Sequence, residues 1–215
     1  MRLRMLSAMM GLAVFMLCSA GDASAALPEF LVSTGSLPVK FTGTAGLTRF
    51  HVAGSITLEC QQTKVSGEVT SSHAGVYKFD VENCRAPGGL ECHTTGDASG
   101  ILLWTGEFHF VRIALSPTKV GLLMSLPALT SSCLGEFATH ENKGFVLPIT
   151  PINTFVTSFL VTAAQSSGIQ EFTSYYNESG TLISGAYLLL TSGPKQFAIE
   201  TTFSLTMERS SEIFA

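Results

Sequence analysis

The sequence predicts an all-β fold, either an antiparallel β-sandwich or a barrel-like domain, with two disulfides and little helix. Apolar residues recur at every second position in several segments. Turn residues separate these segments at intervals of roughly 10–20 residues, as they do in sheets built from hairpins. Four cysteines follow an N-terminal export signal. Together these features favour strands that are paired by hairpins and cross-linked by disulfide bonds.

Alternation near the C-terminus gives the strongest strand prediction. Between Gln196 and Glu208 polar residues take the even positions except 198, and most odd positions are apolar, namely Phe197, Ile199, Phe203, Leu205 and Met207. Successive strand residues point to opposite faces, whereas a helix would distribute these side chains around its circumference. The same alternation marks 55–60, 64–69 and 77–82. Uniformly apolar segments are predicted to be central strands covered on both faces, namely 101–104, 108–115, 120–126 and 187–190.

Residues 1–25 have the pattern of a secretory signal peptide. Arg2 and Arg4 precede a short apolar run over 9–17, and Ala23-Ser24-Ala25 forms an Ala-x-Ala cleavage site. The apolar run is shorter than the roughly 20 residues that cross a bilayer, so no membrane span is expected after cleavage. We therefore expect one secreted domain over 26–215, with its ordered core at about 40–208, located outside the cell or in the cell envelope.

Four cysteines remain after the predicted cleavage, namely Cys60, Cys84, Cys92 and Cys133. An even number in an exported chain predicts two disulfides, for which three connectivities are open. We favour Cys84–Cys92 across the short loop between them, with Cys60–Cys133 joining distant strands. A metal site that uses these thiols with His93 is disfavoured, because no C-x-x-C spacing is present. The sequence therefore predicts neither a metal nor a cofactor.

The charge pattern excludes one class of partner. Charged residues make up 13% of the chain, about half the usual share for a soluble domain, and the net charge is −4. Lysines and arginines are scattered singly, so the basic patch of a nucleic-acid binder is missing. The predicted surface is nearly neutral and rich in hydroxyl groups, and the sequence carries no signal for an oligomeric state.

Several short motifs follow one another in a recognisable order: Ile56-Thr57-Leu58-Glu59-Cys60, Asn83-Cys84 with Cys92 shortly after, Val120-Gly121-Leu122-Leu123, Pro148-Ile149-Thr150-Pro151-Ile152-Asn153-Thr154, and Gln165-Ser166-Ser167-Gly168-Ile169-Gln170-Glu171 with Tyr175 and Asn177. This order resembles an uncharacterised family of exported, β-rich hypothetical proteins that occur in many copies in high-GC Gram-positive soil bacteria. The resemblance covers about residues 40–208. It implies a secreted β-rich protein, and it carries no catalytic or binding residue over to this chain.

Catalytic motifs are mostly missing. The sequence has no Gly-x-Ser-x-Gly, no glycine-rich phosphate loop and no complete His-Glu-x-x-His motif. Three weak candidates remain, Asp80, Glu107 and His109. Glu107 and His109 would point the same way from one strand and could bind a metal with a third ligand. A hydrogen-bonded histidine between two phenylalanines is the favoured interpretation of His109, and an ordinary solvated strand face is the favoured interpretation of Asp80.

The sequence alone leaves the function open between two classes. The favoured expectation is a non-enzymatic extracellular domain, either a surface or matrix component or a binder of a carbohydrate or apolar ligand. Trp104, Tyr175 and Tyr176 are rings that could stack on a sugar, although a single tryptophan in a β domain is expected in the core. The alternative is a secreted hydrolase whose active site is assembled from distant residues such as Glu107, His109 and Asp80.

Overall fold

A computed structural model describes residues 26–215 apart from 54–56, 192 and 194. The predicted signal peptide therefore lies outside the described residues. Nearly all regular structure in the described chain is β-strand, and the helical content there is the 3₁₀ turn η1 (His140–Asn142). The all-β prediction is confirmed.

Most strands belong to one large antiparallel sheet, and a short hairpin of β12 and β13 lies beside it. The strands are β1 (Glu29–Val32), β2 (Val39–Ala45), β3 (Thr48–Val52), β4 (Thr57–Val69), β5 (Ala74–Arg85), β6 (Leu102–Leu115), β7 (Thr118–Met124), β8 (Leu129–Ser131), β9 (Gly135–Thr139), β10 (Phe145–Thr150), β11 (Val156–Ala163), β12 (Gln165–Ser166), β13 (Ile169–Gln170), β14 (Ser174–Tyr176), β15 (Leu182–Ser184), β16 (Leu188–Leu190) and β17 (Lys195–Phe214).

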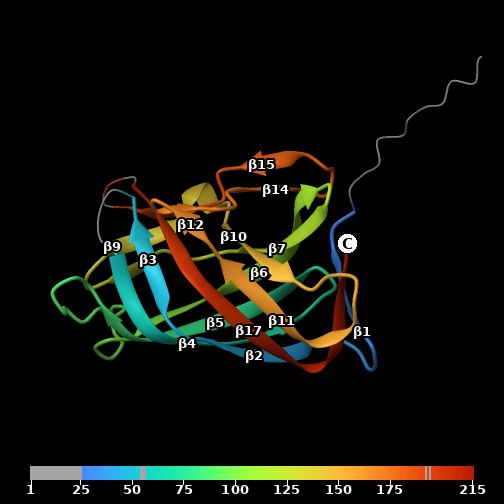
Figure 1. The fold of residues 1–215 in the computed structure, drawn as a ribbon, viewed down its shortest axis with the longest axis horizontal. Helices are drawn as coiled ribbons and strands as arrows, with labels where there is room; N and C mark the ends of the chain where they lie inside the picture. Colours follow the sequence, from blue (N-terminus) through green and yellow to red (C-terminus); the bar gives the residue numbers. More distant parts are fainter. Residues whose placement is uncertain (1–25, 54–56, 192, 194) are drawn as a thin grey trace, which may run out of the picture.

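The long strand β17 closes the sheet. Neighbouring strands follow the order β11-β10-β7-β6-β5-β4-β2-β17, and β17 then pairs with β11. In addition, β3 pairs with both β17 and β4, and β1 pairs with the C-terminal end of β17. Of the two predicted architectures, the structure therefore has the barrel-like one, a closed ring of strands (Figure 1). The strand predicted over Gln196 to Glu208 is confirmed as part of β17.

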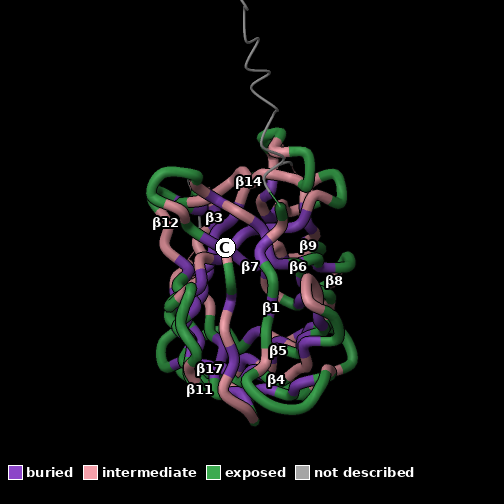
Figure 2. The backbone as a smooth tube through the Cα atoms, turned by 90° about the vertical axis from the view of Figure 1, so that its right-hand side faces the viewer, coloured by how far each residue is buried: buried purple, intermediate pink, exposed green. Residues whose placement is uncertain are grey.

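Aromatic rings fill the interior of the closed sheet, and glycines on neighbouring strands make room for them. Rings and glycines alternate across four neighbouring strands. Gly67 on β4 pairs with Phe41 on β2 and with Tyr77 on β5. Tyr77 pairs in turn with Gly106 on β6. A Cβ added at Gly67 would lie 2.6 Å from the Phe41 ring, and one at Gly106 would lie 2.9 Å from the Tyr77 ring. The cavity left in this interior is about 20 Å³. In Figure 2 buried and exposed stretches alternate along the strands that form the ring, and many of the turns are exposed.

The alternation of buried and exposed residues is interrupted at neighbouring positions of β4 and β5. Buried residues of β4 change from even positions at Cys60 to odd positions at Thr63, and those of β5 change from odd at Val81 to even at Cys84. Cys60 pairs with Cys84 and Thr63 with Val81, so the two changes lie side by side, and Asn83 adopts a φ of 55° there. Local irregularities of this kind increase the coiling that a closed sheet needs. The described part of the first alternating segment, 57–60, and the segment 64–69 are thus parts of one strand, β4.

The predicted number of two disulfides is confirmed, but the favoured connectivity is wrong. The structure joins Cys60 to Cys84 and Cys92 to Cys133. Cys60 and Cys84 are direct cross-strand neighbours and both face the interior, so their Cα atoms lie only 4.0 Å apart. Because the Cys84 sulfur is used there, Cys92 cannot bind it, and Cys92 instead reaches Cys133 in the turn between β8 and β9.

The hairpin of β14 and β15 lies on the outside of the ring (Figure 1). It joins the sheet where Tyr176 pairs with Arg112 on β6, beyond the point at which β5 stops pairing with β6. Beneath this region lies a second apolar cluster that is separate from the interior, made of Val111, Ile113, Val146 and Ala186 with Leu123, Phe172 and Tyr175 against them. The hairpin therefore covers an outer patch of the sheet and creates a crevice along its own edge.

Candidate functional site

A crevice of about 430 Å³ opens where the β14–β15 hairpin meets β6, β7 and the start of the described chain. This volume falls within the range of roughly 300–1,000 Å³ that small-ligand sites usually occupy. Residues from the start of the described chain, from the neighbouring strands β6 and β7, and from β14 and its turn contribute to it. We call it the hairpin crevice, and it is lined by Leu27, His109, Phe110, Val111, Leu123, Tyr175, Asn177, Glu178 and Ser179.

The floor of the hairpin crevice is apolar. Val111 is buried, and half-buried Leu123 and Tyr175 pack against the same outer cluster. The Tyr175 ring thus rests on apolar side chains and also lines the open space. An aromatic ring beside aliphatic groups provides a flat surface for the C–H face of a cyclic ligand, and the tyrosine hydroxyl adds a polar end.

The rim of the hairpin crevice is polar. In the turn after β14, Asn177 Oδ1 accepts hydrogen bonds from the N–H groups of Ser179 (3.1 Å) and Thr181 (2.9 Å) and from the Ser179 hydroxyl (2.8 Å). Because Oδ1 is occupied within the turn, the Asn177 amide nitrogen is the part that can donate to a ligand. His109 is exposed on β6 and has no hydrogen bond to another described residue. Its two ring nitrogens supply one donor and one acceptor when the imidazole is neutral.

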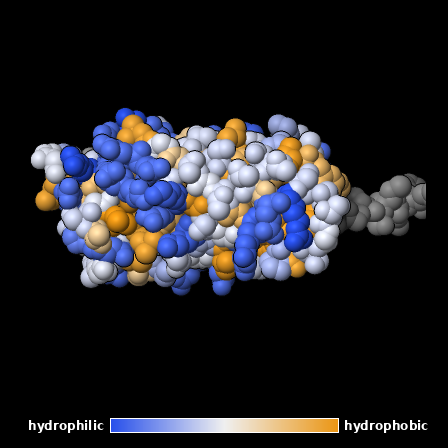
Figure 3. Space-filling view, turned by 90° about the horizontal axis from the view of Figure 1, so that it is seen from below, coloured by the Kyte–Doolittle hydropathy of each residue, from blue (hydrophilic) through white to orange (hydrophobic). Residues whose placement is uncertain are grey.

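Asp80 lies in a different hollow. On the outer face of β2, β4 and β5 an open groove of about 390 Å³ is lined by Thr42, Gly43, Thr44, Lys64, Val65, Ser66, Lys78 and Asp80. The Asp80 Oδ1 atom is buried and has no hydrogen-bond partner among the described atoms. Seen from below, pale side chains of intermediate hydropathy separate two hydrophilic clusters on the underside of the molecule (Figure 3).

The three catalytic candidates do not converge. Glu107 pairs with Val76, and Val76 is four residues from Asp80 on β5, which corresponds to about 13 Å along a strand. His109 is two residues further away still. Glu107 lies between the two hollows and lines neither. The structure therefore brings His109 into the hairpin crevice with Tyr175 and leaves Asp80 and Glu107 elsewhere.

One ion pair lies beside the Asp80 groove. Lys64 Nζ hydrogen-bonds to Glu82 Oε1, which raises the Lys64 pKa, and the charge of Asp80 adds to the shift. Over the described parts of the chain, no group of three or more His, Cys, Asp or Glu residues has the geometry to hold a metal ion. Lys64 thus forms an ion pair with Glu82 beside the groove.

The ring residues expected from the sequence have different positions. Trp104 is only 4% exposed and lies among interior rings, so the expectation of a core tryptophan is confirmed. Tyr175 and Tyr176 are half-buried in β14, and of the two only Tyr175 lines the hairpin crevice. Leu123 and Asn177 also line it. The sequence does not predict that Leu123 and Asn177 share a site, because only the tertiary fold brings β7 and the polar turn at 177–180 together.

The fold and the crevice define an all-β protein with a closed antiparallel sheet and an external ligand-sized hollow. No protein-family model, curated protein or solved structure matches the chain. Among the residues that the structure describes, no helix has the length and apolar character needed to cross a membrane.

Proposed function

We propose that this protein is a secreted carbohydrate-binding domain that holds a neutral sugar in the hairpin crevice. The carrying observation is the meeting of an apolar floor, the Tyr175 ring and the polar groups of His109 and Asn177 in one open space. Sugars combine an apolar ring face with peripheral hydroxyl groups, and binding sites with a few oriented polar groups on an apolar surface complement that combination.

Two further observations support export and an external ligand. The predicted signal peptide and the two disulfides fit an oxidising compartment outside the cytoplasm. An interior cavity of about 20 Å³ has room for roughly one water molecule, so a ligand fits outside the ring of strands and not within it. An apolar carrier role would need an enlarged interior, which makes the carbohydrate the better ligand of the two expected from the sequence.

Titration calorimetry with neutral disaccharides tests this proposal. Cellobiose, maltose and N,N′-diacetylchitobiose serve as probes for the wild type and for His109→Ala and Tyr175→Leu. Loss of one or two ligand hydrogen bonds, or of the ring surface, should weaken binding of the preferred disaccharide about tenfold. Glu107→Ala is the matched control, because Glu107 is exposed on the same face of β6, two residues from His109, and does not line the crevice.

The proposal fails if none of the disaccharides binds, or if the Glu107 and His109 variants weaken binding equally. Thermal unfolding of each variant separates lost binding from lost folding. Tyr175→Leu keeps apolar contact with the outer cluster, so this variant should remain folded.

A further inference from the structure

A second group of side chains, on β3, β4 and β17, connects a hydroxyl, an imidazole and a carboxylate. Thr57 Oγ1 lies 3.2 Å from His51 Nδ1, and His51 Nε2 lies 2.9 Å from Glu200 Oε2. Thr57 and His51 are cross-strand neighbours in the β3–β4 pair, and Glu200 comes from the adjacent part of β17. Closure of the sheet therefore brings together residues separated by 149 positions.

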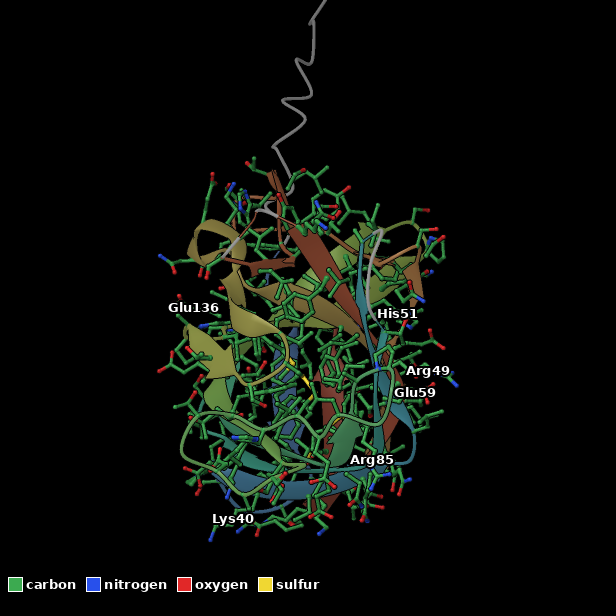
Figure 4. The ribbon with its side chains drawn as sticks, turned by 90° about the vertical axis from the view of Figure 1, so that its left-hand side faces the viewer. Lys40, Arg49, His51, Glu59, Arg85 and Glu136 are labelled. Atoms are coloured by element: carbon green, nitrogen blue, oxygen red, sulfur yellow. A yellow bond between two sulfur atoms is a disulfide. The ribbon has the colours of Figure 1, made fainter. Side chains whose placement is uncertain are left out.

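The carboxylate at the end of this chain is firmly positioned. Glu200 Oε2 also accepts a hydrogen bond from Gln165 Nε2 at 2.8 Å, and Gln165 Oε1 accepts the backbone N–H of Gly168 at 2.9 Å. Glu200 Oε1 lies 3.6 Å from Arg49, whose Nε hydrogen-bonds to Glu59. Arg49, His51 and Glu59 project outward along one side of the molecule in Figure 4.

These contacts determine the roles of the two imidazole nitrogens. Hydrogen bonds from Gln165 and His51 and the charge of Arg49 lower the pKa of Glu200, so the carboxylate is ionised near neutral pH. An ionised carboxylate accepts a hydrogen bond, so in the neutral imidazole the hydrogen lies on His51 Nε2 and Nδ1 keeps its lone pair. Nδ1 then accepts the Thr57 hydroxyl hydrogen. A nucleophile beside a base that a third group orients is the arrangement that activates hydroxyl groups in acyl-transfer enzymes.

Another histidine in the same protein has half of this arrangement. Ser132 Oγ lies 3.2 Å from His93 Nδ1, the same separation as in the Thr57–His51 pair. No carboxylate among the described side chains binds the other nitrogen of His93. The two hydroxyl–imidazole pairs thus differ in one respect: a carboxylate orients His51, and no carboxylate among the described side chains orients His93.

We propose that Thr57, His51 and Glu200 form an acyl-transfer site that cleaves small carboxylic esters. Thr57 Oγ1 bonds to the ester carbonyl carbon while its proton moves to His51 Nδ1. The bond to the leaving alkoxide breaks, and the alkoxide takes that proton and departs as an alcohol. A water molecule then attacks the acyl-threonine carbon and gives a proton to Nδ1. The bond between the acyl carbon and Thr57 Oγ1 then breaks, Oγ1 takes that proton from His51, and the carboxylic acid is released.

Glu200 is a positioning residue in this scheme. It stays ionised, holds the Nε2–H tautomer and stabilises the imidazolium that forms in each step. Thr57 and His51 are both half-buried, so the hydroxyl lies within reach of an ester from solvent. The site is separate from the hairpin crevice, and its activity does not depend on sugar binding there.

The experiment uses the purified protein with p-nitrophenyl acetate. We expect an initial burst of p-nitrophenolate and an acetyl group on the peptide that contains Thr57, detected by mass spectrometry. General-base catalysis contributes about 10²–10⁴-fold, so Thr57→Val and His51→Gln should lower the acylation rate at least about 100-fold. Thr57→Ser keeps the hydroxyl and should rescue the reaction. Glu200→Gln should lower the acylation rate without moving the adduct from Thr57.

Matched controls are His93→Gln and Ser132→Ala, which remove the pair that lacks a carboxylate and should leave the rate unchanged. Valine has nearly the shape of threonine, and a thermal melt of each variant verifies folding. An unchanged rate in folded Thr57→Val, an acetyl group found only on lysines, or equal losses in the His51 and His93 variants would each overturn the proposal.

Discussion

The inner and outer faces of the same strands differ in how tightly they are packed. On β5, Phe79 faces inward and is 4% exposed, with ring centroids of Tyr77, Trp104 and Phe203 between 5.0 and 5.5 Å away. Its neighbour Lys78 faces outward, is exposed and lines the open groove. Adjacent residues on one strand thus occupy a close-packed aromatic interior and a solvated surface. Stability should depend on the inner face, and binding and chemistry should depend on the outer face.

The largest expected effect comes from removing an inner ring. Phe79→Ala should lower the free energy of unfolding by about 3–5 kcal/mol, because the cavity left among three rings cannot fully collapse. Lys78→Ala is the matched control on the opposite face, and its effect should stay within about 0.5 kcal/mol. Denaturant unfolding with the disulfides intact measures both values. Similar losses in the two variants would contradict the division between the faces.

A somewhat smaller loss is expected when a methyl group is added to the inner face. In Gly67→Ala the new Cβ would lie 2.1 Å from the Val76 carbonyl oxygen, which is backbone and cannot turn away, and 2.6 Å from Phe41. Overpacking of this kind costs about 1–3 kcal/mol or more. Gly46→Ala is the control, because nothing lies within 4 Å of its added Cβ. We expect a melting temperature close to wild type for Gly46→Ala and a clear decrease for Gly67→Ala.

The inner face was predictable from the sequence to a large extent. Alternation at Phe197, Ile199 and Phe203 gave the right secondary structure and the right face, because period-two burial is a local property of a strand. The disulfide connectivity was not predictable in this way. Cys84 has Cys92 close in sequence and Cys60 opposite in space, and only the register of β4 with β5 decides between them.

The outer sites were much less predictable, because each combines segments that only closure brings together. His109 was a sequence candidate, but its neighbours Leu123 and Asn177 come from a different strand and a distant turn. His51 had no recognisable partner in the sequence, since Glu200 is 149 residues away. Motifs such as His-Glu-x-x-His reveal sites on one helix. A site across three strands of a ring leaves no comparable spacing.

The smallest expected effect concerns the outer carboxylate Glu200, whose side chain is 41% exposed. The pKa of Glu200 in the folded protein lies below the ordinary value of 4.5. The hydrogen bond from Gln165 is the largest cause, followed by the hydrogen bond from His51 and the charge of Arg49. Ionised Glu200 therefore stabilises the fold above about pH 4.5, and that contribution is lost as the pH falls through the lowered pKa. Solvent screening limits it, so Glu200→Gln should cost less than about 1 kcal/mol at neutral pH.

Because the variant has no carboxylate at position 200, the stability difference from wild type should shrink as the pH falls below about 4.5 and disappear in stronger acid. Denaturant unfolding of both proteins between about pH 7 and pH 3 follows this difference directly. A difference that stays constant over the range would show that the amide disturbs packing instead of removing a charge. A loss as large as that of Phe79→Ala would mean that the outer network carries as much stability as the aromatic interior, which would contradict the contrast between the two faces.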